Sequence, residues 1–162
     1  MSDVYGIHGQ TLEVIILRCN KLKNTGLFTK QNPYVIVEYN NCKFQTRTCT
    51  DGDTEPVFDE KFHITLIAGI LDMNIYVWNS NSVMRDTFIG SGRVQLNKVI
   101  TEGFDDSICV IKTNGSKYAG DVKLIMHFSR NPLIRTADIT DTETNQQADT
   151  YCSVQEGHWT YM

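Results

Sequence analysis

Hydrophobic and polar residues alternate along several short stretches of this chain, which is the period of a β-strand with one buried face. Residues 10–18 place Leu12, Val14 and Ile16 on one face and contain β-branched side chains that favour strands. Further stretches of this kind lie at 34–39, 42–50, 62–67, 71–78, 88–94, 107–113 and 119–128. The pattern predicts eight strands.

The connections between these strands are too short for crossover helices, which favours an antiparallel sandwich over alternating βα units. Asn40-Asn41 and residues 113–116 have the composition of tight hairpin turns, and residues 96–103 are the one helical insertion we expect. If consecutive strands run antiparallel, loops 19–32, 51–60 and 79–87 share one end of the sandwich with the turn at 114–118. The Asn40-Asn41 turn and residues 68–70 and 95–106 then lie at the other end.

The alternation stops near Asn131-Pro132, so we expect a folded domain over 1–129 and an acidic, low-complexity C-terminal tail over 130–162. Threonine, aspartate and glutamine dominate residues 136–150, a composition typical of disordered chain. The tail either serves as a solubilising extension or acts as an arm that docks on a partner. In the second interpretation the anchors are Tyr151, Trp159 and Tyr161.

Charge and composition narrow the function classes. The 162 residues carry a net charge of −4 and include no Lys/Arg run, which disfavours nucleic-acid binding. The chain has no apolar stretch long enough to span a membrane and no signal sequence, so we expect a cytoplasmic protein. Its five cysteines include no Cys-x-x-Cys pair, so we expect no structural zinc.

Five segments, taken in their order along the chain, resemble the C2 domain, an eight-stranded antiparallel β-sandwich. These segments are residues 9–17, the Asn-Pro-Tyr segment at 30–37, the Glu-Pro segment at 55–62, residues 75–78 followed by 88–90, and residues 120–128. The size and the short polar tail look most like the small plant elicitor-responsive and phloem-type C2 proteins. The resemblance implies an all-β fold and a module that binds membrane phospholipids or proteins.

Calcium-binding C2 domains hold the ion with aspartates from the loops at one end of the sandwich. In this sequence those positions carry no carboxylate, since they are Gly26, Asn32, Asn79, Asn81 and Thr87. An asparagine keeps a carbonyl oxygen but loses the negative charge that draws calcium out of water. We therefore expect no cofactor and no tight calcium site, and we interpret the asparagines as holding the loops through Asx turns to their own backbone.

A weak, displaced calcium site stays open as an alternative at Asp51, Asp53 and Asp86, with Glu55 nearby. These four acids belong to the same predicted end of the sandwich. A charged loop of this kind is more often simply solvated.

The same end offers apolar residues beside cations, which is the composition of a loop that inserts among lipid headgroups. The predicted membrane-binding loops contain Lys21, Lys23, Leu27, Phe28, Lys30, Val83, Met84 and Arg85. The alternative is that Leu27 and Phe28 fold under their loop as a small apolar cluster. Lys43, Gln45 and Arg47 are a poor match to a phosphoinositide-binding strand face, and we interpret them as solvated.

Catalysis has no support in the sequence, because its four histidines are isolated and no nucleophile or phosphate-loop motif is present. We therefore predict a non-enzymatic, calcium-independent C2 adaptor that is peripheral to membranes and binds anionic membrane surfaces, protein partners, or both. The alternative is a constitutive scaffold subunit of a larger assembly, with the tail as its docking arm.

Overall fold

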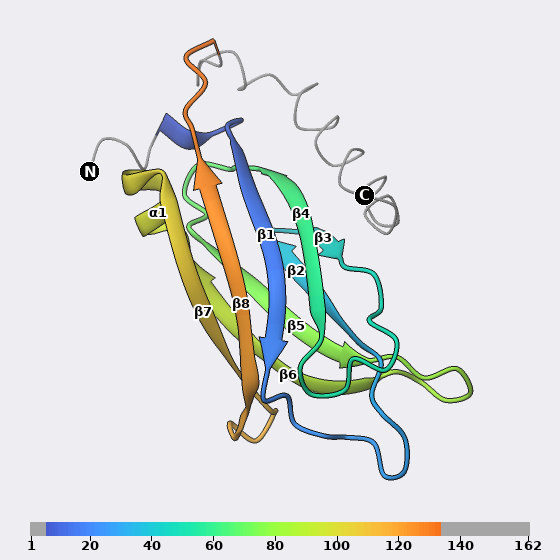
Figure 1. Ribbon diagram of the computed structural model, residues 1–162. Helices are drawn as coiled ribbons and strands as arrows, with labels where there is room; N and C mark the ends of the chain where they lie inside the picture. The colour runs from blue at the N-terminus through green and yellow to red at the C-terminus, as the bar shows by residue number, and fades with distance from the viewer. Residues whose placement is uncertain (1–5, 134–162) are drawn as a thin grey trace.

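The computed structural model describes residues 6–133, which form eight β-strands and one short helix (Figure 1). Every strand pairing in this part of the chain is antiparallel. The elements are β1 (Thr11–Asn20), β2 (Pro33–Tyr39), β3 (Cys42–Gln45), β4 (Val57–Thr65), β5 (Asp72–Asn79), β6 (Thr87–Gln95), α1 (Asn97–Glu102), β7 (Phe104–Lys112) and β8 (Tyr118–Phe128).

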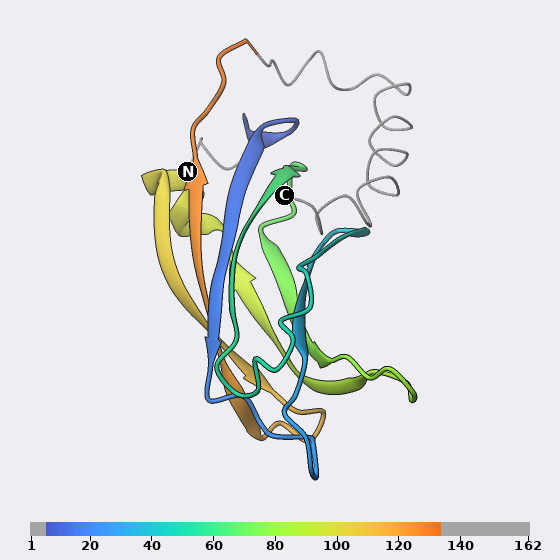
Figure 2. The same ribbon diagram turned by 45° about the vertical axis from the view of Figure 1, so that its right-hand side comes forward.

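The strands are hydrogen-bonded in the order β3-β2-β5-β6-β7-β8-β1-β4. Strands β6 and β7 are joined at the single register pair Ser91 and Lys112. The sheet therefore divides there into two four-stranded layers, which Figure 2 shows side by side. The predicted eight-stranded antiparallel sandwich with a short helical insertion is confirmed.

The core lies between the two layers and is filled by alternate residues of each strand. In β4 the burial alternates without interruption, so that Phe58, Glu60, Phe62 and Ile64 point inward. Full burial of one such apolar side chain contributes about 1.5–3 kcal/mol. Phe62 also meets Phe44 of β3 at a centroid separation of 6.0 Å, which links the two layers at their outer edge.

The two largest errors in the predicted strand boundaries concern β3 and β4. The strand predicted over 42–50 ends at Gln45, because Thr46 accepts the Val35 N–H with its hydroxyl oxygen and Arg47 then turns to the other layer. The Arg47 guanidinium donates to the Phe58 carbonyl and pairs with Glu60 of β4 at 3.0 Å. The strand predicted over 62–67 begins earlier, at Val57. The prediction missed this start because the charged residues around Glu60 hide the alternation.

The two ends of the sandwich differ. The end opposite the long loops carries α1, whose left-handed C-cap is Gly103, and the Asn40-Asn41 hairpin (Figure 1). We call the other end the loop end. It consists of residues 21–32, 46–56 and 80–86, and backbone hydrogen bonds such as Leu22 N–H to the Thr54 carbonyl join these loops. The predicted grouping of the loops is confirmed. Within residues 6–133, no helix has the length and apolarity needed to cross a membrane.

Candidate functional site

The loop end is organised around a buried glutamine. Gln31 is 1% exposed, although it follows Lys30 in a polar segment. Its side-chain oxygen accepts from the Thr25 N–H at 2.9 Å and from the Thr25 hydroxyl at 2.6 Å. Its amide nitrogen donates to the Lys23 carbonyl at 3.0 Å and to the Asp53 carbonyl at 3.4 Å. One side chain thus fastens the 21–32 loop to itself and to the 46–56 loop.

Two asparagines extend these contacts to the third loop. The Asn79 side-chain oxygen accepts from the Asn32 N–H at 2.8 Å, and the Asn32 side-chain oxygen accepts from the Asp51 N–H at 2.8 Å. The Asn79 amide also donates to the Thr25 hydroxyl at 3.4 Å. We call Gln31, Asn32 and Asn79, with these partners, the amide network.

The predicted Asx turns are therefore not what Asn32 and Asn79 form, since both bridge different segments of the chain. Asn81 acts more locally and donates to the Arg85 carbonyl and to the Thr87 hydroxyl, each at 2.9 Å. Gly26 donates its N–H to the Asn24 side chain, which is an Asx turn at a neighbouring position. Of the five positions predicted from the calcium pattern, Gly26, Asn32 and Asn81 lie in the loop end, and Asn79 and Thr87 are the strand residues that border its third loop.

The arrangement is unfavourable for a cation at these positions. The side-chain oxygens of Asn32 and Asn79 already face backbone N–H donors, and neither carries a charge. In the described part of the chain, no three acidic, histidine or cysteine side chains are gathered as a metal site. Asp86 is turned toward the outer face of the sheet, where it accepts from the Tyr34 hydroxyl at 2.6 Å. It is not gathered with Asp51 and Asp53 into such a group.

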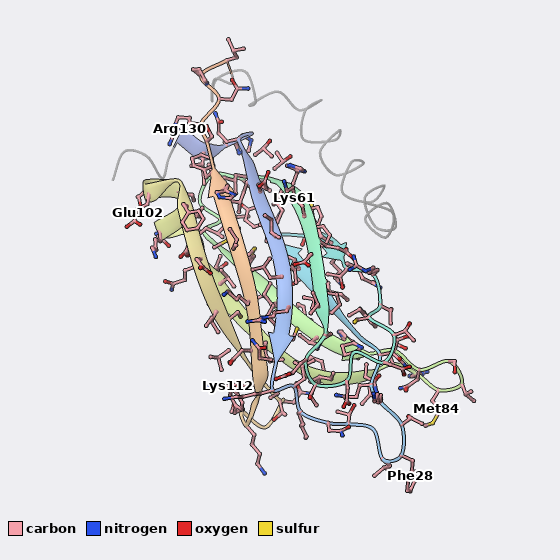
Figure 3. The ribbon with its side chains drawn as sticks, in the orientation of Figure 1. Phe28, Lys61, Met84, Glu102, Lys112 and Arg130 are labelled. Carbon is pink, nitrogen blue, oxygen red and sulfur yellow. The ribbon has the colours of Figure 1, made fainter. Side chains whose placement is uncertain are left out.

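The predicted membrane-binding side chains stand at the extremity of the loop end, where Figure 3 labels Phe28 and Met84. Four apolar side chains, the loop tips, are almost fully exposed: Leu27 at 89%, Phe28 at 96%, Val83 at 93% and Met84 at 77%. Leu27 and Phe28 therefore do not fold under their loop. The cations Lys21, Lys23, Lys30 and Arg85 are also exposed at this end.

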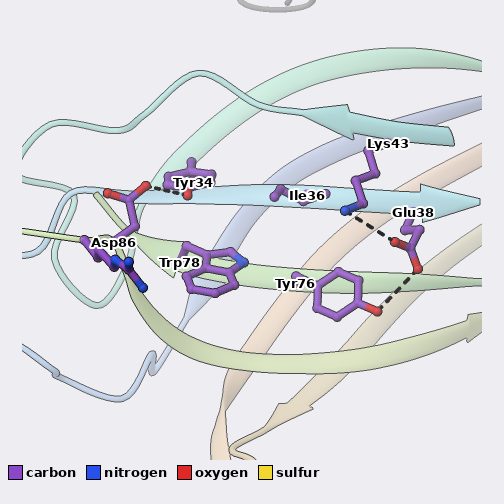
Figure 4. A pocket seen from close by; sticks show the side chains of 8 residues that line it. Tyr34, Ile36, Glu38, Lys43, Tyr76, Trp78 and Asp86 are labelled. Atoms are coloured by element: carbon purple, nitrogen blue, oxygen red, sulfur yellow. Dashed lines mark hydrogen bonds and ion pairs between the residues drawn. The ribbon is translucent and has the colours of Figure 1, made fainter. Parts of the chain in front are cut away.

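A second surface lies on the outer face of β2 and β5, where Tyr34, Ile36, Tyr76 and Trp78 point away from the core (Figure 4). Burial and the adjacent Asp86 carboxylate raise the pKa of Tyr34, so its hydroxyl stays protonated and donates. Burial and Glu38 raise the pKa of Tyr76 in the same way. Sequence reasoning missed this surface, although aromatic residues at outward positions of two strands were its signal.

Lys43 and Gln45 are exposed on the face of β3, as expected, but Arg47 is not simply solvated. Arg47 leaves that face to pair with Glu60, and Lys43 lies 3.9 Å from the Glu38 carboxylate. Gln31 was also missed, since nothing in its neighbourhood marks a buried position. The predicted partner-binding residues Tyr151, Trp159 and Tyr161 lie outside the described residues.

Comparison with known proteins agrees with this architecture. The family model of the C2 domain matches residues 10–109, and the chain belongs to the C2 domain family. Among curated proteins it is similar to "Elicitor-responsive protein 3" of Oryza sativa subsp. japonica, with 22% identity over 119 residues that cover 74% of this chain and 83% of the relative. It is also similar to "16 kDa phloem protein 2" of Arabidopsis thaliana, with 21% identity over 121 residues that cover 75% and 82% of the two chains.

Among solved structures, a C2 domain-containing protein from a putative elicitor-responsive gene superposes with a TM-score of 0.66. The two share 19% identity, and the match covers 78% of this chain and 94% of the other. This likeness concerns the fold. Domains of this family generally bind membrane lipids or proteins, and that is the level at which the comparisons define the function.

Proposed function

We propose that this C2 domain docks on anionic membrane surfaces through its loop tips and does so without calcium. The observation that carries the proposal is the exposure of Phe28, at 96%, on a loop whose base is fastened by the buried Gln31. A large apolar side chain held out in water on an ordered loop gains free energy when it enters the interfacial region of a bilayer.

The energies favour weak, reversible docking. Full burial of one large apolar side chain contributes about 1.5–3 kcal/mol, and each cation near an anionic leaflet about 1 kcal/mol. These gains are partly offset by the loss of translational and rotational freedom, which costs about 4 kcal/mol or more. Asp51 and Glu55 are exposed at the same end and repel anionic lipid, so contact is made by the 21–32 and 80–86 loops.

The amide network supports the proposed calcium independence. In a calcium-dependent arrangement the ion links carboxylates of neighbouring loops and supplies charge toward the lipid. Here neutral amides link the loops, and the positive charge toward the lipid comes from side chains such as Lys30 and Arg85. Loop order and membrane attraction therefore need no ion.

The test is co-sedimentation with vesicles of phosphatidylcholine and phosphatidylserine in the presence of EGTA. The wild-type protein should bind, and Phe28→Ala should weaken binding about ten- to hundredfold, the equivalent of one inserted aromatic side chain. Phe104→Ala is the matched control, because Phe104 is an exposed phenylalanine (47%) on β7 beside α1, away from the loop tips. It should bind as the wild type does.

Failure of the wild-type protein to sediment would refute membrane docking and favour the alternative, a scaffold subunit in a protein assembly. Equal loss of binding in Phe28→Ala and Phe104→Ala would also contradict the proposal, because binding would then not depend on the loop tips.

A further inference from the structure

The outer face of β2 and β5 is hollowed into what we call the aromatic groove, with a volume of about 640 Å³ (Figure 4). Its floor consists of Tyr34, Ile36, Tyr76 and Trp78, which lie on paired strands. Trp78 meets Phe88 of β6 edge to face, with ring centroids 5.2 Å apart. The groove is therefore an ordered, largely apolar surface on the outside of the sandwich.

Most polar side chains of the aromatic groove are paired with one another, and Arg85 is the exception. The Tyr34 hydroxyl donates to Asp86 at 2.6 Å, and the Tyr76 hydroxyl donates to Glu38 at 3.4 Å. Lys43 is within 3.9 Å of the same Glu38 carboxylate. Apart from Arg85, what remains for an occupant is ring and methyl surface, which suits an apolar or aromatic side chain better than a multiply charged headgroup.

The chain itself contains such an occupant. Residues 134–162 lie outside the described residues and include Tyr151, Trp159 and Tyr161. They carry one arginine and five carboxylates, so they are acidic. Arg85, which lines the aromatic groove and is exposed, offers a complementary charge at its loop end.

We propose that residues 134–162 of the same chain dock in the aromatic groove, with aromatic side chains of 151–161 packed over Tyr34, Ile36 and Trp78. In this proposal the segment docks on its own domain rather than on a separate partner. The docking does not depend on membrane binding.

The connection is long enough. The described chain leaves the sandwich at Asn131, whose N–H donates to the Gln10 side chain at 2.7 Å, beside the N-terminal end of β1. The 18 residues that follow Leu133, up to Tyr151, span up to about 60 Å when extended, whereas the ten-residue strand β1 is about 33 Å long. A tethered segment also acts at an effective concentration on the order of millimolar, so contacts of modest strength suffice.

The chain has two tryptophans, Trp78 in the aromatic groove and Trp159 in the segment, which makes a clean test possible. In Trp159→Phe the segment keeps its aromatic character and Trp78 becomes the only tryptophan. In the triple variant Y151S/W159S/Y161S, Trp78 is again the only tryptophan, but the segment has lost its aromatic side chains. Both variants leave residues 6–133 unchanged.

The test compares the acrylamide quenching of Trp78 fluorescence in the two variants. Docking predicts a quenching constant in Trp159→Phe about half that of Y151S/W159S/Y161S, since a packed aromatic side chain excludes the quencher from the indole. Equal constants in the two variants would overturn the proposal. Protection that grows with protein concentration would also overturn it, because the segment would then be docking on a second copy.

A synthetic peptide of residues 145–162 tests the location. Added to Y151S/W159S/Y161S, it should restore the protection of Trp78. Ile36→Glu, introduced into this triple variant, should abolish that effect. Ile108→Glu, on the exposed outer face of β7 (64% exposed), is the matched control and should preserve it. Restoration that survives Ile36→Glu, or no restoration at all, would contradict docking in the aromatic groove.

Discussion

Replacement of Gln31 by alanine tests the amide network directly. Gln31 is 1% exposed and makes hydrogen bonds to Thr25, Lys23 and Asp53 at 2.6–3.4 Å. The three shorter bonds contribute about 1 kcal/mol each, so Gln31→Ala should lower the free energy of unfolding by about 3 kcal/mol. For a domain of this size that corresponds to a fall in Tm of about 10 °C.

Urea unfolding, followed by far-UV circular dichroism, measures this loss. Gln45→Ala is the matched control, because Gln45 is exposed on β3, and it should stay within about 0.5 kcal/mol of the wild type. Calcium at about 1 mM should change the free energy of unfolding of neither variant. An ion that binds no tighter than about 10 mM adds only about 0.1 kcal/mol. A loss below about 0.5 kcal/mol in Gln31→Ala, or its recovery by calcium, would refute the idea that amides hold the loops.

Three further outcomes are expected. The triple variant N32D/N79D/N81D should gain calcium binding measurable by calorimetry, because it restores negative charge at the loop end, and no heat of binding at millimolar calcium would contradict this. Arg47→Ala should lower the free energy of unfolding by about 2 kcal/mol. This is less than for a fully buried ion pair, because Arg47 is half exposed. An unchanged urea midpoint would count against a stabilising pair between Arg47 and Glu60. Burial raises the pKa of Glu60 from 4.5, because it outweighs the opposite effect of the Arg47 charge and hydrogen bonds. The stability that Glu60 contributes is therefore present at low pH and is lost as the pH rises through the raised pKa. Between about pH 4 and pH 7 the wild type should therefore lose stability relative to Glu60→Gln, and a constant difference between the two would be the contrary result.

Alternation of apolar and polar residues was sufficient to predict the sandwich, because most strands bury one face only. Leu12, Val14 and Ile16 of β1 show this in its simplest form. The pattern failed where a charged side chain is buried with a partner. Glu60 points inward in β4, and its partner Arg47 comes from a segment that no local pattern connects with it.

The candidate site was predictable in position but not in its contacts. The sequence indicates which loop residues have lost their carboxylates, since those positions are defined along the chain. It does not indicate that Asn79 meets Asn32, or that Gln31 is buried, because these contacts depend on how three loops meet in space. The aromatic groove was missed for a related reason, since Tyr34 and Trp78 become neighbours only when β2 pairs with β5.

Membrane docking of the loop end without a metal ion makes a direct prediction about affinity. The most direct test is the dissociation constant of the wild-type protein for vesicles of phosphatidylcholine and phosphatidylserine, measured once in EGTA and once in calcium at about 1 mM. We expect binding in both, with dissociation constants equal within about twofold, a difference of about 0.4 kcal/mol. Binding that appears only with calcium would contradict it.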